Sequence, residues 1–244
     1  MGDKTVLELL VDAADELGVQ HQWASAFSAY NEGDTSDVKL RRSLTKTCQY
    51  LAKSLDWEII TSERTFTTVA GEEQTDWRPA NFLRFVPDTL WNRSGNLPII
   101  GPLSPGQWQQ YKAGFIIPTY PAFFIRSKRL YFASPPGAGQ TVAFEYITNE
   151  IGENAAGDRV SEFTADTDVP LWDDELLTLG IIANYRQFER MEFASDKLAF
   201  ELCLSNNYKA DGGVKVFDMN QGTANPADTL VNGMKNRVVA ISTS

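Results

Sequence analysis

Helical periodicity near both ends of the chain, with a different pattern between them, is the feature that most constrains the fold. Apolar residues recur at helical spacing over residues 5–17 and 36–55, and again over residues 170–208. From about residue 58 to residue 150, short runs of β-forming residues alternate with turns. Because each helix pair leaves an apolar face that the other pair can cover, this order predicts a helical bundle interrupted by an inserted β-module.

Two helices carry clear start and stop patterns. Thr5 and Glu8 have the spacing of a capping box, and Gly18 supplies the stop of the first helix. Ser104 and Gln107 form a second capping box with proline at the first helical position, which predicts a short helix to about Lys112.

The central region reads as antiparallel strands. Residues 122–126 and 129–133 flank Ser127 and Lys128, which predicts a tight hairpin. Apolar and other residues alternate over residues 142–146, which predicts a half-buried strand. Several short strands at this spacing favour a small sandwich or barrel.

The predicted class is therefore α+β, a four-helix-type bundle interrupted by an antiparallel β-sandwich or β-barrel module, with an extended C-terminal arm. The last segment has few large apolar residues before residue 238, so it cannot bury enough surface to fold alone. The predicted divisions are 1–57 and 170–211 for the bundle, 58–150 for the β-module, 151–169 for an acidic loop, and 212–244 for the arm.

Composition narrows the function classes. Lys and Arg number 22 against 32 Asp and Glu, so the formal net charge of −10 argues against generic binding to a phosphate backbone. Cys48 and Cys203 lie in helix-like stretches and are expected to be buried reduced thiols. No window reaches the roughly 20 apolar residues of a membrane span, and the amphipathic start predicts no targeting segment.

Residue types for catalysis are sparse. His21 is the single histidine, so zinc clusters and histidine-based triads lack partners, and no glycine-rich phosphate loop is present. A pair of carboxylates suffices for a glycosidase, and Glu145 and Glu63 are the candidates with apolar neighbours. Solvated strand faces also carry glutamate routinely, so we expect no enzyme activity and no cofactor.

A metal site is the second weak candidate. Asp166 and Asp168, with Asp158 and Glu162 upstream, offer hard oxygen ligands for Ca²⁺. They lack the spacing and the glycine of an EF-hand, so an acidic solvated loop without a metal is favoured.

Aromatic side chains are concentrated in the β-module. They suit the core of a small sheet, and they also leave open a module that stacks on sugars. They are Trp77, Trp91, Trp108, Tyr111, Tyr120, Phe123, Phe124 and Tyr131.

A set of segments, taken in order along residues 1 to about 210, resembles bacteriophage head-to-tail connector proteins, the adaptor or tail-tube-type proteins of short-tailed and related phages. The segments are 65–74 (TFTTVAGEEQ), 82–93 (FLRFVPDTLWNR), 98–105 (PIIGPLSP) followed by Trp108, 143–147 (AFEYI), 163–168 (FTADTD) and 176–180 (LLTLG).

The resemblance implies a structural virion protein at the head–tail junction, assembled in the host cytoplasm. It implies a homo-oligomeric ring of about twelve copies, a dodecamer, seated below the portal protein. Double-stranded DNA passes through the ring during ejection without sequence-specific binding, and the other side meets a downstream tail or nozzle protein. A net negative wall suits such a conduit, because it repels DNA and lets it slide. Screening at physiological salt keeps this repulsion within about 8 Å of the wall.

Three groups of residues are assigned roles on this interpretation. The third helix is apolar nearly all round, which suits a position inside a bundle or at a heterologous subunit contact. The subunit contact is predicted at Leu177, Ile181, Tyr185 and Phe188, and the tail-facing surface of the β-module at Trp91, Trp108 and Tyr120. The portal-binding arm is predicted to use Val214, Val216, Phe217, Met234, Arg237, Val238, Val239 and Ile241.

Two alternatives remain open. A carbohydrate- or cell-wall-binding tail module would use the aromatic residues of the β-module. A stand-alone enzyme would use the paired carboxylates, with Glu145 as the residue whose replacement by Gln abolishes activity.

Overall fold

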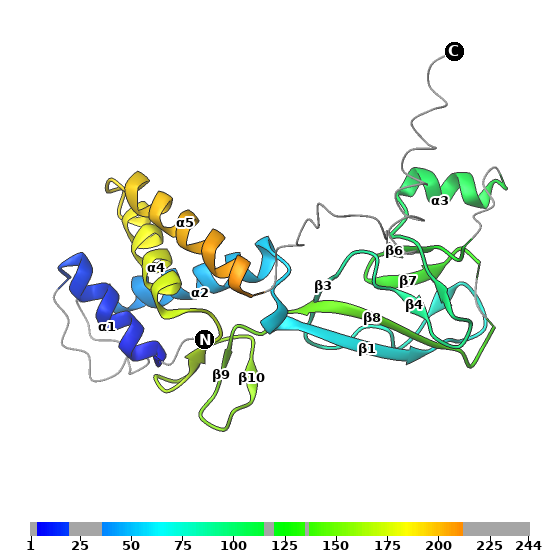
Figure 1. The fold of residues 1–244 in the computed structure, drawn as a ribbon, viewed down its shortest axis with the longest axis horizontal. Coiled ribbons are helices and arrows are strands. Elements are labelled where there is room, and N and C mark those ends of the chain that lie inside the picture. The colour runs from blue at the N-terminus through cyan, green and yellow to red at the C-terminus, as the bar shows by residue number, and fades with distance from the viewer. Residues whose placement is uncertain (1–3, 20–35, 115–119, 135–136, 212–244) are drawn as a thin grey trace, which may run out of the picture. The chain divides into compact units, whose positions relative to one another are not determined.

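In the computed structural model, which describes residues 4–19, 36–114, 120–134 and 137–211, helices flank a region of strands along the chain (Figure 1). Residues 1–213 form one compact unit. The described part is mixed α and β, with antiparallel sheets that do not close into a barrel. Its five α-helices are α1 (Val6–Leu17), α2 (Ser36–Ser54), α3 (Pro105–Lys112), α4 (Asp174–Phe188) and α5 (Ala194–Ala210).

The strands form three antiparallel sheets. In the five-stranded sheet β8 pairs with β1, β3 and β4, and β4 pairs with β5. The two three-stranded sheets have the orders β2-β7-β6 and β10-β9-β11. The strands are β1 (Thr61–Thr67), β2 (Glu73–Gln74), β3 (Phe82–Phe85), β4 (Trp91–Asn92), β5 (Leu97–Pro98), β6 (Phe123–Arg126), β7 (Arg129–Phe132), β8 (Thr141–Thr148), β9 (Gly152–Glu153), β10 (Arg159–Val160) and β11 (Val169–Pro170).

Local sequence explains where the helices begin and end. Both predicted capping boxes are present, at Thr5 with Glu8 and at Ser104 with Gln107, and Gly18 ends α1 in the left-handed conformation with φ of 68°. Asp173 caps α4 by accepting a 3.1 Å hydrogen bond from the backbone of Leu176. These interactions satisfy backbone groups that the helix ends would otherwise leave without partners.

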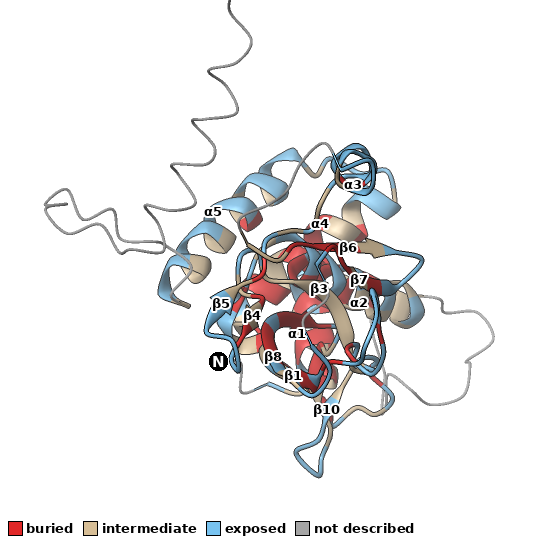
Figure 2. Ribbon diagram, turned by 90° about the vertical axis from the view of Figure 1, so that its right-hand side faces the viewer, coloured by how far each residue is buried: buried red, intermediate tan, exposed pale blue. Residues whose placement is uncertain are grey.

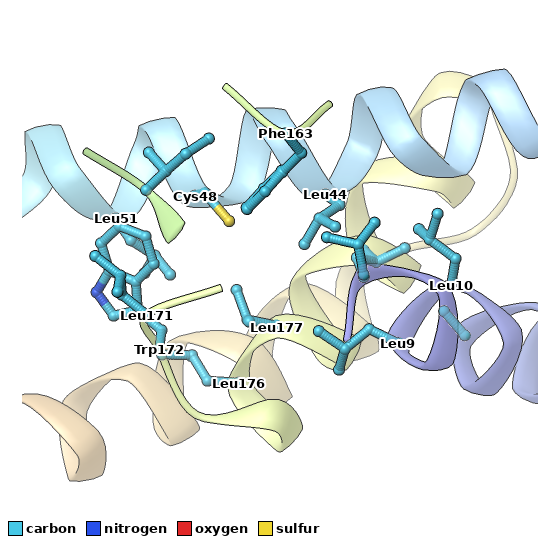
Figure 3. Packing of buried hydrophobic residues seen from close by; sticks show 14 of the residues in the cluster. Leu9, Leu10, Leu44, Cys48, Leu51, Phe163, Leu171, Trp172, Leu176 and Leu177 are labelled. Carbon is cyan, nitrogen blue, oxygen red and sulfur yellow. The ribbon is translucent and has the colours of Figure 1, made fainter. Parts of the chain in front are cut away.

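Helices α1, α2, α4 and α5 share one apolar core. Figure 3 shows side chains of α1, α2 and α4 pointing toward one another, among them Leu10, Leu44 and Leu177. The side chain of Thr47 lies so close to Gly180 that a Cβ on this glycine would stand 2.4 Å from the Thr47 Cγ2. The small residue on α4 therefore permits a close approach to α2.

A second core lies between the five-stranded sheet and the β2-β7-β6 sheet. It joins Phe66 and Phe144 of the larger sheet to Phe132 of the smaller one. Trp77 stacks on Phe85 at 5.4 Å between ring centroids. The aromatic residues of this region are therefore mainly core residues, as one of the two sequence-based interpretations holds.

Strand β8 fits the prediction of a half-buried strand in part, since Val142, Phe144 and Tyr146 are buried and Glu145 is exposed. Phe144 belongs to the core between the sheets, whereas Ile147 on the opposite face belongs to the helical core. On the face of Ile147, Ala143 is buried as well, whereas Glu145 is exposed, so this second face is covered only in part. The burial of Ala143 and Ile147 depends on distant partners and cannot be read from the alternation of residue types alone.

The segment 151–169, predicted as an acidic loop, contains paired strands. β9 pairs with both β10 and β11, and Ile151 and Phe163 insert into the helical core. These two apolar anchors hold an otherwise polar segment against the helices. None of the helices in the described ranges combines the length and apolarity needed to cross a bilayer.

Candidate interaction surfaces

Helix α5 carries the two most exposed of the large apolar side chains in the described helical region. Leu198 and Leu202 are 59% and 61% exposed, and they stand one helical turn apart on one face. Figure 2 shows most of α5 coloured as exposed or intermediate. Phe188 at the end of α4 and Met191 after it are also more than half exposed. We call Leu198 and Leu202 the α5 apolar face.

The buried side of α5 is set by Phe200. The Phe200 ring lies against Gly180 of α4, where an added Cβ would stand 3.0 Å from the ring atom Cε2. The centroid of the same ring lies 6.1 Å from the centroid of the Tyr50 ring. Burying Phe200 turns Leu198 and Leu202 away from the core. The sequence places Leu198, Leu202 and Cys203 on one face, but only Cys203 of the three packs against the helical core, where it is partly buried.

The predicted subunit contact on α4 divides into two parts. Leu177 and Ile181 are fully buried in the core of their own chain, and Tyr185 is nearly so. Helices α1, α2 and α5 all pack against α4, which accounts for its apolar residues on every side. The prediction that Leu177 and Ile181 contact another subunit directly is therefore wrong, because both side chains pack inside their own chain. Phe188 is 56% exposed and is the member of this set available at the surface.

The predicted tail-facing residues lie in different environments. Trp108 of α3 is only 8% exposed, and it stacks on Phe124 at 5.1 Å with 16° between the ring planes. Lys112 Nζ lies 5.1 Å from the centroid of the same indole. Trp91 and Tyr120 are half-buried. A cleft of about 550 Å³ runs along Trp108 and Phe124, between α3 and β6.

The two carboxylates singled out as a catalytic alternative stand directly opposite each other. Glu63 of β1 pairs in register with Glu145 of β8, and both side chains are exposed. Arg93 forms an ion pair with Glu63, which offsets the repulsion between two like charges on neighbouring strands. The arrangement on an open strand face therefore has a structural role as a cross-strand charge cluster.

Asp168, one of the predicted calcium ligands, is 1% exposed and already bound to the backbone. Its Oδ2 accepts hydrogen bonds of 2.7 Å from Thr164 and 2.9 Å from Ala165. Its carbonyl oxygen accepts a 2.8 Å bond from the backbone nitrogen of Val6 at the start of α1. The aspartate thereby joins the loop to the first helix.

Three other side chains with potential metal-binding atoms lie close together. Single ligand atoms of Asp173, Glu175 and Cys203 lie within 4.8 Å of one another. Asp173 already caps α4, and Asn207 donates a 3.3 Å hydrogen bond to the Cys203 sulfur. Burial, and then the nearby carboxylates, raise the pKa of Cys203, so the group favours a protonated thiol over a thiolate ligand.

Cys48 fulfils the prediction of a buried reduced thiol. It is fully buried, and burial raises its pKa strongly. Cys203 is also reduced but only partly buried. Neither thiol therefore has the lowered pKa of a reactive cysteine.

His21 and the predicted arm, including Val214, Val216, Phe217, Met234, Arg237, Val238, Val239 and Ile241, lie outside the described residues. Comparison with protein-family models gives no match to this chain. Comparison with curated proteins gives no significant match either.

Proposed function

We propose that this chain is a structural subunit of the ring that joins a bacteriophage capsid to its tail and lines the DNA channel below the portal. The observation that carries the proposal is the α5 apolar face, on which Leu198 and Leu202 are exposed. Two exposed leucines one helical turn apart form a small apolar face that a protein contact would bury. The ordered resemblance along residues 1 to about 210 points to the same class of protein.

The proposal includes a four-helix bundle, an inserted β-sandwich and a C-terminal arm. We infer that α1, α2, α4 and α5 act as a four-helix bundle, because they share one core. The five-stranded sheet and the β2-β7-β6 sheet share the second core and act as an inserted β-sandwich. The segment 212–244 provides the arm that reaches the portal protein.

The ring contact is placed on the bundle. A closed ring requires a heterologous contact, in which one surface of a subunit meets a different surface of the next. The α5 apolar face and Phe188 supply one of the two surfaces, and Leu177 and Ile181 support it from within. About twelve copies complete the ring, as the resemblance implies, in the virion after assembly in the host cytoplasm.

The β-module contributes the surface toward the downstream tail protein. The cleft between α3 and β6, with Trp108 in its wall, is the feature that fits an inserted segment of a partner. The carbohydrate-binding alternative is less well supported, because Phe124 and Lys112 already cover the Trp108 ring on which a sugar would stack. The enzyme alternative has only the two exposed glutamates of neighbouring strands.

The direct test is the native mass of the purified chain at near-physiological salt, alone and with portal rings added. A discrete species near twelve times 27.2 kDa, or a complex containing portal and chain, is the expected result. Leu198→Glu with Leu202→Glu is expected to prevent ring formation and leave a folded monomer. Leu97→Glu, at an exposed leucine of β5, is the matched control and is expected to assemble normally.

A second experiment tests the arm. A chain that ends at residue 211 is expected to keep its melting temperature and to lose binding to portal rings. A truncated chain that binds portal rings as well as the full chain would overturn the role given to the arm. Saturable binding to peptidoglycan, lost on Trp91→Ala or Trp108→Ala, would favour the carbohydrate-binding alternative.

A further inference from the structure

A cleft between α2 and α4 gathers positive charge in a chain whose net charge is −10. It has a volume of about 400 Å³, and four basic side chains contribute to its wall. They are Lys39, Arg42 and Lys46 from α2, and Arg190 from the turn after α4. We call this cleft the basic groove.

Helical geometry explains the three cations on α2. Positions 39, 42 and 46 follow one another at three and four residues, so their side chains lie along one face of the helix. At 1.5 Å per residue they span about 10 Å along the axis. Arg190 has a positive φ of 59° and joins them from the opposite wall.

The charge in the groove is only partly neutralised. Lys39 forms a 2.7 Å ion pair with Glu189. Within the described ranges, no carboxylate lies within ion-pair distance of Arg42, Lys46 or Arg190. Among the described residues, the four cations of the lining have one ion-paired carboxylate, that of Glu189, so positive charge is in excess. Repulsion among these side chains is unfavourable unless an anion lies among them.

The walls of the groove are tied together. Asn184 of α4, which also lines the groove, donates a 2.9 Å hydrogen bond from Nδ2 to Thr47 Oγ1 of α2. Ser43 and Gln187 add a hydroxyl and an amide as neutral donors beside the cations. The two helices that carry these donors are therefore held at a fixed position relative to each other.

We infer that the basic groove binds closely spaced phosphate groups. The guanidinium groups of Arg42 and Arg190 match phosphate oxygens in a bidentate manner, and the lysines act as point charges. A span of about 10 Å along the α2 axis is long enough for the cations to contact more than one phosphate of a chain. The same chemistry is offered by a free polyphosphate chain and by a nucleic-acid backbone.

The overall charge of the chain is compatible with this site. Screening limits the influence of distant charges to about 8 Å at physiological salt, so the groove acts through its own cations. The expectation from composition, that generic phosphate binding is disfavoured, concerns the chain as a whole and does not extend to this groove. The inference does not depend on the ring proposal and is tested on the full chain without portal.

The experiment measures binding of two probes, sodium tripolyphosphate and a short DNA duplex, by calorimetry and fluorescence anisotropy at low and moderate salt. Arg42→Gln with Lys46→Gln is expected to weaken the binding of both probes at least tenfold. It is also expected to reduce the salt slope for the duplex by about 2. Lys53→Gln with Lys209→Gln, which changes the net charge equally outside the groove, is the matched control and is expected to bind within twofold of the wild type.

Each pattern of results has a meaning. If both probes bind and compete with each other, the result supports phosphate binding by the groove and identifies the nucleic-acid backbone as an accessible ligand. Binding of tripolyphosphate alone supports the groove and identifies a free polyphosphate. Absence of binding by the wild type, or equal loss in the groove and control variants, overturns the inference. Arg42 and Lys46 are exposed, so unchanged melting temperatures are expected to show that the variants fold.

Discussion

Gly180 of α4 faces Thr47 of α2 so closely that the two helices have no room for a methyl group between them. A Cβ on Gly180 would lie 2.4 Å from the Thr47 Cγ2 and 3.0 Å from the Phe200 ring. The adjacent hydrogen bond from Asn184 to Thr47 fixes the same approach. This contact thus positions α4 against α2 and α5, and it lies beside the wall of the basic groove.

Gly180→Ala is therefore expected to destabilise the chain. Overpacking of this kind costs about 1–3 kcal/mol, measurable as a lower urea midpoint with an unchanged slope. Gly106→Ala in α3 is the control, because open space surrounds that glycine, and it is expected to be neutral or to stabilise by about 0.4–1 kcal/mol. Adding Thr47→Ser to Gly180→Ala removes the nearest methyl group and is expected to recover part of the loss.

Local signals in the sequence predict local structure well in this chain. The capping boxes at Thr5 and Ser104 depend only on residues three positions apart, and both are present. The hairpin at residues 127–128 depends on the two strands that flank it, and it is present as well. Such features require no knowledge of the tertiary fold.

Features that depend on distant partners were not accessible in the same way. The leucines of α5 have helical spacing, but only the position of Phe200 against α4 decides that they face outward. The cations of α2 are visible in the sequence, whereas the approach of Arg190 depends on how α4 packs. The burial of Ile147 on the second face of β8 likewise depends on the helical core, which is distant in the sequence.

Asp168→Asn is expected to lower the free energy of unfolding by about 1–3 kcal/mol. The buried carboxylate accepts two backbone hydrogen bonds, and the amide replaces a charged acceptor by a weaker one. Glu162→Gln, at an exposed residue of the same segment, is the control and is expected to change stability by less than about 0.5 kcal/mol. Millimolar Ca²⁺ is expected to leave the melting temperature of the wild type unchanged, and a clear increase would revive the calcium interpretation of this segment.

Ser127→Asn with Lys128→Gly is expected to stabilise the β6–β7 hairpin. Both residues have positive φ, 51° and 64°, which is the conformation of a two-residue turn that favours Asn-Gly. Relief of about 1–2 kcal/mol of backbone strain exceeds the entropic cost of glycine, about 0.5–1 kcal/mol. The expected net gain is about 0.5–1 kcal/mol in thermal or urea unfolding. Lys128→Pro forces φ negative and is expected to destabilise the chain, so a stabilising proline would contradict the turn geometry.

The capping box of α1 predicts how stability responds to acid. Hydrogen bonds from the backbone and hydroxyl of Thr5 lower the pKa of Glu8 below its ordinary value. Because the folded-state pKa is the lower one, this contribution is fully present above the ordinary pKa of glutamate and is lost as the pH falls through the folded value. Glu8→Gln keeps a side chain that can close the capping box and removes the titration. The variant is therefore expected to lose less stability than the wild type between about pH 5 and pH 3, compared by urea unfolding at each pH. Identical pH profiles for the two proteins would show that Glu8 titrates alike in the folded and unfolded chain.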